Sequence, residues 1–63
     1  DKIEITNSLG NIGFHYKEQG NYPKALEYYK RDLKIQEEIG YKKGTGNSLN
    51  NIGEIYIVQS RIN

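Results

Sequence analysis

The chain contains no cysteine, methionine or tryptophan, and it has a single histidine, His15, and a single proline. The absence of cysteine excludes disulfide frameworks and thiol catalysis, and with one histidine it also excludes zinc fingers. No serine is placed at triad spacing to use His15, so no enzyme is expected. A cysteine-free chain fits a reducing compartment, which favours a cytoplasmic location. With 63 residues, the chain can form one small unit with a limited core.

Long apolar runs and blocks of like charge are also missing. Nine Lys and Arg residues nearly cancel eight Asp and Glu residues, and the two signs alternate along the chain. A nucleic-acid partner would need a basic stripe, and a membrane span would need about 20 apolar residues. Neither partner is therefore expected. The first residues lack both a signal peptide and an initiator Met, so the chain is expected to be a segment of a longer protein.

An internal repeat is the most informative feature that the sequence does contain. The segment 47–56 repeats the segment 7–16 forty residues further along the chain. The shared apolar residues are spaced as one stripe of a helix. They are Leu9, Ile12, Gly13 and Tyr16, and then Leu49, Ile52, Gly53 and Tyr56. Because glycine inside a helix costs about 1 kcal/mol relative to alanine, Gly13 and Gly53 predict close contacts between neighbouring helices.

The sequence predicts an all-α fold in which three helices stack as antiparallel hairpins. The expected ranges are 6–19, 23–39 and 46–60, with a loop at 41–45. Thr6 or Asn7 is expected to cap the first helix, and Pro23 suits the first turn of the second. Gly20 and Gly40 are placed to end these helices in the left-handed conformation.

These residues resemble the tetratricopeptide repeat, which combines Leu and Gly in one helix with Ala and an aromatic residue in the next. The matching positions are Leu9, Ile12, Gly13, Tyr16, Ala25 and Tyr29. On this resemblance, the chain 1–63 is a piece of an α-solenoid, with a first repeat at 6–41 and the first helix of a second at 46–63. The long period, compared with the usual 34 or so, is similar to that of kinesin light chain and the Pins-type spindle-orientation scaffolds.

The resemblance implies a protein-binding scaffold without a cofactor or metal. In this family the first helices line a concave groove that accepts a peptide or helix of a partner protein. The residues expected to face the groove are Asn7, Asn11, Phe14, Lys17, Asn47, Asn50, Asn51 and Glu54. Asn11 and Asn51 are favoured as clamps for a peptide backbone, and the alternative is that they bridge adjacent helices. Gly10 and Phe14 replace the Lys and Asn of the family's carboxylate clamp, so that clamp is not expected.

The third predicted helix carries an apolar edge. Repeat arrays generally need about three repeats and polar caps to be stable, so an edge of this kind is expected to find a neighbour. The residues expected to be exposed and to mediate self-association are Ile55, Ile57, Val58 and Ile62. Self-association could occur as an oligomer or by the exchange of helices between copies. The alternatives are therefore a peptide-binding module, a self-associating segment, or the sensor part of a larger regulator or enzyme.

Overall fold

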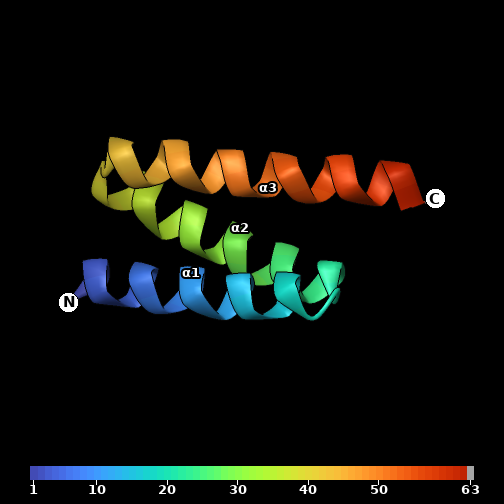
Figure 1. Cartoon of the computed structure of the whole chain (residues 1–63). Coiled ribbons are helices and arrows are strands. Elements are labelled where there is room, and N and C mark those ends of the chain that lie inside the picture. The colour runs from blue at the N-terminus through green and yellow to red at the C-terminus, as the bar shows by residue number, and fades with distance from the viewer. Residues whose placement is uncertain (63) are drawn as a thin grey trace.

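Three α-helices form the protein in the computed structural model, which describes residues 1–62 and the side chains up to Arg61. They are α1 (Lys2–Glu18), α2 (Tyr22–Ile39) and α3 (Lys42–Ile62). Figure 1 shows α1 and α3 running in the same direction, with α2 between them in the opposite direction. The described residues contain no strand, so the predicted all-α fold of antiparallel hairpins is confirmed.

The first helix begins about one turn earlier than predicted and is capped by Asp1. The Asp1 carboxylate accepts a hydrogen bond of 3.1 Å from the Glu4 backbone N–H, which satisfies a free amide of the first turn. Thr6 is instead buried within the helix, where its hydroxyl donates to the Ile3 carbonyl. The prediction that Thr6 or Asn7 caps this helix is therefore wrong, because Asp1 caps an earlier turn.

Both turns between helices are built around a left-handed glycine, as predicted. Gly20 has φ 80° and Gly40 has φ 72°, a region that glycine enters without the steric cost of a Cβ. In each turn, the N–H that follows the glycine donates to the carbonyl four residues before the glycine, at 2.9 Å. This bond is part of the Schellman motif, which ends a helix and redirects the chain. Adjacent helices are therefore antiparallel neighbours.

The third helix begins at Lys42, inside the segment 41–45 that was predicted to be a loop. A Cβ added at Gly44 would lie 2.7 Å from the Tyr41 ring and 2.9 Å from the amide of Gln36. The missing side chain thus lets the start of α3 approach the end of α2 closely. The prediction of a loop is wrong because this packing outweighs the low helix propensity of glycine.

The core is small and is centred on α2. Its buried apolar residues are Ala25, Tyr29, Ile52 and Ile55, and the half-buried Tyr16, Tyr22, Leu26 and Leu33 pack against them. A Cβ at Gly13 would come within 2.8 Å of the Tyr29 ring, so the predicted close contact at Gly13 is confirmed. At Gly53, nothing in the described part of the chain lies within 4 Å of such a Cβ, and the contact predicted there is not formed.

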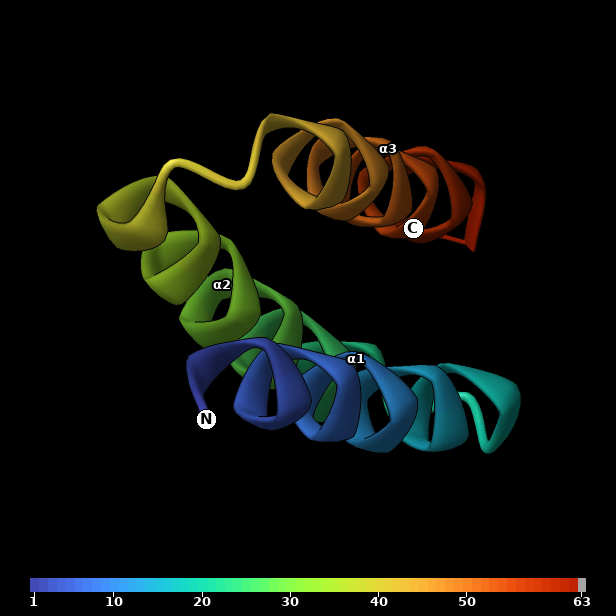
Figure 2. The ribbon, with the colours of Figure 1, turned by 90° about the vertical axis from the view of Figure 1, so that its left-hand side faces the viewer.

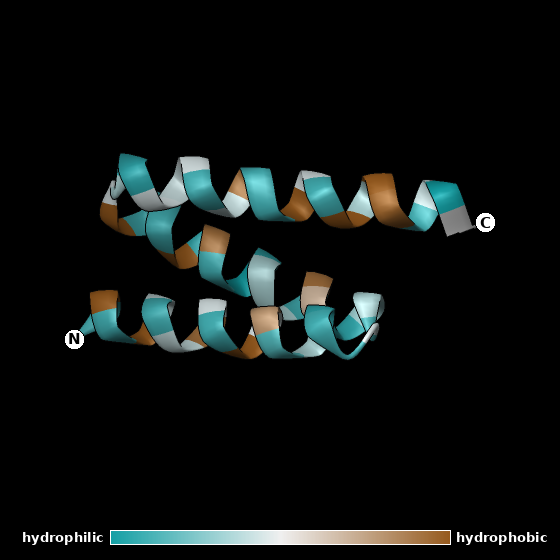
Figure 3. Ribbon diagram, viewed as in Figure 1, coloured by the Kyte–Doolittle hydropathy of each residue, from teal (hydrophilic) through white to brown (hydrophobic). Residues whose placement is uncertain are grey.

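The helices α1 and α3 contact α2 with different faces. The buried residues of α3 are Gly44, Ser48, Ile52 and Ile55, and the positions forty residues earlier on α1 are Glu4, Ser8, Ile12 and His15, all of which are exposed. The predicted apolar stripe is therefore only partly buried, since Ile12, Leu49 and Tyr56 are exposed. Figure 3 shows apolar and polar residues alternating along every helix. The stripe is buried differently in α1 and α3 because each of them packs against a different face of α2, which lies between them (Figure 1).

Candidate functional site

A groove lies between α1 and α3, with α2 as its floor. Figure 2 shows α1 and α3 as two arms that spread apart on one side of α2. The groove holds a cavity of about 360 Å³, within the range of about 300–1,000 Å³ found for ligand pockets. The lining residues are Thr6, Asn7, Gly10, Asn11 and Phe14 of α1, Tyr29, Asp32 and Gln36 of α2, Tyr41 of the turn, and Gly44, Asn47, Ser48 and Asn51 of α3.

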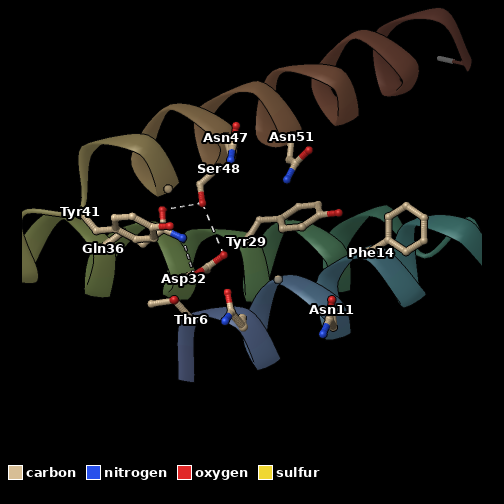
Figure 4. Close-up of a pocket in the computed structure, with 13 residues that line it drawn as sticks. Thr6, Asn11, Phe14, Tyr29, Asp32, Gln36, Tyr41, Asn47, Ser48 and Asn51 are labelled. Atoms are coloured by element: carbon tan, nitrogen blue, oxygen red, sulfur yellow. Dashed lines mark hydrogen bonds between the residues drawn. The ribbon is translucent and has the colours of Figure 1, made fainter. Parts of the chain in front are cut away.

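Four asparagines from the two copies of the repeated segment line this cavity. Asn7 and Asn11 lie one helical turn apart on α1, and Asn47 and Asn51 occupy the corresponding places on α3. Figure 4 shows Asn11 on one wall of the cavity and Asn47 and Asn51 on the other. Asn51 is half-buried and the other three are exposed, so a bound molecule can reach their amides. Each amide offers two donors and an acceptor.

The other predicted groove residues divide into three kinds. Phe14 lines the same cavity as the asparagines, whereas Asn50 is exposed on α3 and does not line it. Lys17 and Glu54 face each other across the groove, with 3.7 Å between Lys17 Nζ and Glu54 Oε2. Lys17 Nζ also lies 4.9 Å from the centre of the Phe14 ring, a cation–π distance. These three side chains thus meet at one place between α1 and α3.

The Lys17–Glu54 ion pair lines a second cavity of about 310 Å³. The second cavity is lined by Lys17, Glu18, Tyr22, Glu54, Ile55 and Val58. The first cavity ends at Phe14 on α1 and at Asn51 on α3, one turn before the paired residues. The ion pair therefore crosses from α1 to α3 about one turn beyond the first cavity.

A buried polar cluster of Asp32, Gln36 and Ser48 forms part of the floor and ties α2 to α3 (Figure 4). Gln36 Nε2 donates to Asp32 Oδ1 at 2.8 Å, and Ser48 Oγ lies 2.9 Å from Gln36 Oε1 and 3.4 Å from Asp32 Oδ2. A serine hydroxyl has one proton, so the shorter bond to Gln36 is the strong one. The sequence reasoning missed this cluster. Its signal was the spacing of Asp32 and Gln36, which continue the buried row of Ala25 and Tyr29 along α2.

The floor of the cavity is electrostatically unusual. Burial raises the pKa of Asp32 above its ordinary value, and hydrogen bonds from Ser48 and Gln36 offset this in part. None of the ion pairs among the described residues involves Asp32. Burial, together with nearby carboxylates, also raises the pKa of Tyr29, so its hydroxyl stays protonated at neutral pH. The floor thus presents a carboxylate without a cation beside a neutral phenol.

The edge that was predicted to mediate self-association is only partly exposed. Ile55 is 0% exposed because its side of α3 packs against α2, so the prediction that it is exposed is wrong. Ile57 is 56% exposed and Val58 is half-buried. The side chain of Ile62 lies outside the described residues. The accessible part of the predicted edge therefore centres on Ile57.

The structure is a helical repeat that offers a binding surface. It has stacked antiparallel helices, a glycine contact between them and a groove along one side. The chain matches the tetratricopeptide repeat family over residues 4–62, and it belongs to that family. It is also 39% identical over 57 residues to G-protein-signaling modulator 1 of Homo sapiens, a match that covers 90% of this chain. The chain spans only 8% of the length of that relative. No solved structure matches it significantly.

Tetratricopeptide repeats are non-enzymatic repeats that mediate interactions between proteins. Membership of this family identifies the chain as part of a protein–protein interaction scaffold. None of the helices in the described part of the chain combines the length and the apolar character that crossing a bilayer requires. The functional question is therefore which surface of the repeat binds another protein.

Proposed function

We propose that the groove between α1 and α3 binds an extended segment of a partner protein. The observation that carries the proposal is the convergence of Asn7, Asn11, Asn47 and Asn51 on one cavity. An extended peptide presents N–H and C=O groups in alternation, and an asparagine amide can both donate to and accept from such a backbone. Asparagines on both walls can hold a peptide main chain whatever its side chains are.

The hydrogen bonds of the fold support this binding role. The side-chain hydrogen bonds found among the described residues involve none of these four amides. Asparagines that served to bridge α1 and α3 would use their amides for that purpose. Because these amides are free to bind a ligand, the binding role is favoured over the alternative in which they bridge adjacent helices.

Replacing Asn11 and Asn51 by alanine tests the proposal. Peptides that bind the full-length protein are first selected from a random peptide library, and their affinities are then measured by fluorescence polarisation. A neutral hydrogen bond contributes about 0.5–1.5 kcal/mol, so losing one on each wall should weaken binding by about tenfold or more. Asn50→Ala is the matched control, since Asn50 is exposed on α3 outside the cavity. Unchanged affinity in the double variant, or no selected peptide at all, would contradict the proposal.

Self-association through α3 is a second candidate function. Leu49, Tyr56 and Ile57 are each about half exposed, and they give α3 an apolar outer surface. Ile57→Lys places a charge on that surface without touching the groove, so it should abolish self-association and leave peptide binding intact. Sedimentation of the unaltered and variant proteins measures this. A protein that stays monomeric at micromolar concentration contradicts this second function.

A further inference from the structure

The cavity contains a buried negative charge that no cation in the described chain neutralises. Asp32 is 4% exposed and, among the described residues that line the cavity, it is the charged one. A buried carboxylate without a counter-ion is costly, because it gives up its hydration. The hydrogen bond from Gln36 and the longer contact with Ser48 satisfy it only in part, since neither supplies a positive charge. A cation brought in by a ligand would supply what is missing.

The two oxygens of Asp32 differ in how strongly they are hydrogen-bonded. Oδ1 accepts the short bond from Gln36, whereas Oδ2 has only the 3.4 Å contact with Ser48, whose proton is used by Gln36. On the side of α1, Oδ2 faces Gly10, and a Cβ there would lie 3.2 Å from it. The corresponding position of the second repeat is Asn50. Because Gly10 has no side chain, no Cβ crowds Oδ2 from the side of α1.

We propose that the groove selects partner peptides that carry a basic side chain, above all arginine, whose guanidinium donates to Asp32 Oδ2. This inference rests on the proposed peptide-binding function and gives it a chemical specificity. A guanidinium has five donors in a planar fork. The oxygens of Tyr29, Asn11 and Asn51, which line the same cavity, can accept hydrogen bonds from other donors of the bound peptide. An acidic side chain in this place would be repelled.

The aromatic ring at the edge of the cavity suits the same ligand. Phe14 is exposed by 52%, and the ammonium of Lys17 already lies 4.9 Å from the ring centre, so the ring face attracts cations in this structure. At the same end, Glu54, one turn beyond Asn51 on α3, is already paired with Lys17 and adds no net charge. The carboxylate of Asp32 at the floor is therefore the group that distinguishes a basic side chain from a neutral one.

The test compares arginine with citrulline, which has the same shape but no charge. Peptides are selected on the full-length protein from a random library, and each arginine of the best binder is replaced in turn by citrulline. One of these replacements should weaken binding to the unaltered protein by about tenfold to a hundredfold, the range for a hydrogen bond to a charged group. The Asp32→Asn variant should bind the two forms of the peptide nearly equally. Asparagine can keep the bond from Gln36 and donate to Ser48, so this variant is expected to fold.

Two further measurements keep the inference separate from the proposed function. Gly10→Ala puts a methyl group beside Oδ2 and should weaken the arginine peptide more than the citrulline peptide. Glu38→Gln removes an exposed charge of α2 that does not line the cavity, and it should change neither. Selected peptides without any enrichment in basic residues, or equal binding of arginine and citrulline peptides, would overturn the inference and leave peptide binding standing. A library that yields no binder would overturn the proposed function itself.

Discussion

The ring of Tyr29 lies directly on Gly13, so that a Cβ at Gly13 would come within 2.8 Å of the ring carbons Cδ1 and Cε1. Tyr29 is almost completely buried and comes from the middle of α2. This contact fixes how closely α1 approaches α2. It therefore also sets the distance between the asparagines on the α1 wall and the polar floor of the groove.

Gly13→Ala should destabilise the protein. Overpacking a core costs about 1–3 kcal/mol, and the gain in helix propensity from alanine is about 1 kcal/mol. The free energy of unfolding in urea is expected to fall by up to about 2 kcal/mol, the difference between these two effects.

Gly53→Ala is the matched control, because Gly53 occupies the same place in the second copy of the repeat. Nothing in the described part of the chain lies within 4 Å of a Cβ at Gly53. The helix-propensity gain then acts alone, and the free energy of unfolding should rise by up to about 1 kcal/mol. Effects of the same sign at Gly13 and Gly53 would contradict the packing described for Tyr29.

The sequence could predict features that depend on local chemistry or on the repeat itself. Gly20 and Gly40 follow helical segments directly, where a left-handed glycine is the common ending. Gly13 recurs as Gly53 inside a helical stripe, which indicated a close contact at Gly13. The asparagines lie beside that stripe, and for this reason they could be assigned to a common face before the fold was known.

The sequence could not predict which neighbour covers each face. Ile12 and Ile52 are identical in the repeat, yet Ile12 is exposed and Ile52 is buried, because α1 and α3 pack against α2 through different faces. The same arrangement buries Ile55, which was expected to be exposed. The place of Asp32 in the buried cluster could not be predicted either, since its bond partner Ser48 comes from a different helix. Such contacts depend on the tertiary arrangement of the helices.

Ile55→Ala and Ile57→Ala should have very different effects on stability, although the two residues lie two positions apart on α3. Ile55 is fully buried, and truncating a buried isoleucine costs about 2–5 kcal/mol. Ile57 is 56% exposed, and surface substitutions usually change stability by no more than about 0.5 kcal/mol. Urea unfolding of both variants provides the measurement. Comparable losses would show that Ile57 is covered by a neighbour in solution.

The stability contributed by Asp32 should depend on pH. Because burial raises its pKa in the folded state, the folded protein holds the proton more tightly than the unfolded chain does. This contribution is fully present below the ordinary pKa of an aspartate and is lost as the pH rises through the raised, folded-state value. Asp32→Asn should remove this part of the pH dependence. Thermal unfolding of both proteins at several acidic pH values measures this contribution. The same dependence of Tm on pH in the two proteins would contradict the prediction.

The ion pair between Lys17 and Glu54 should stabilise the groove weakly and in a salt-dependent way. Both side chains are partly exposed, and such pairs contribute about 0.2–1 kcal/mol. A double-mutant cycle with Lys17→Met and Glu54→Gln measures the coupling, which should fall as salt screens the charges. The pair of Glu27 and Arg31 is the reference, since it lies within α2 and cannot tie α1 to α3.

If Lys17 and Glu54 hold the two walls of the groove together, breaking their pair should also speed hydrogen exchange in both α1 and α3. Breaking the reference pair should leave exchange in those two helices unchanged, and equal exchange in the two cases would show that the cross-groove pair has no such role.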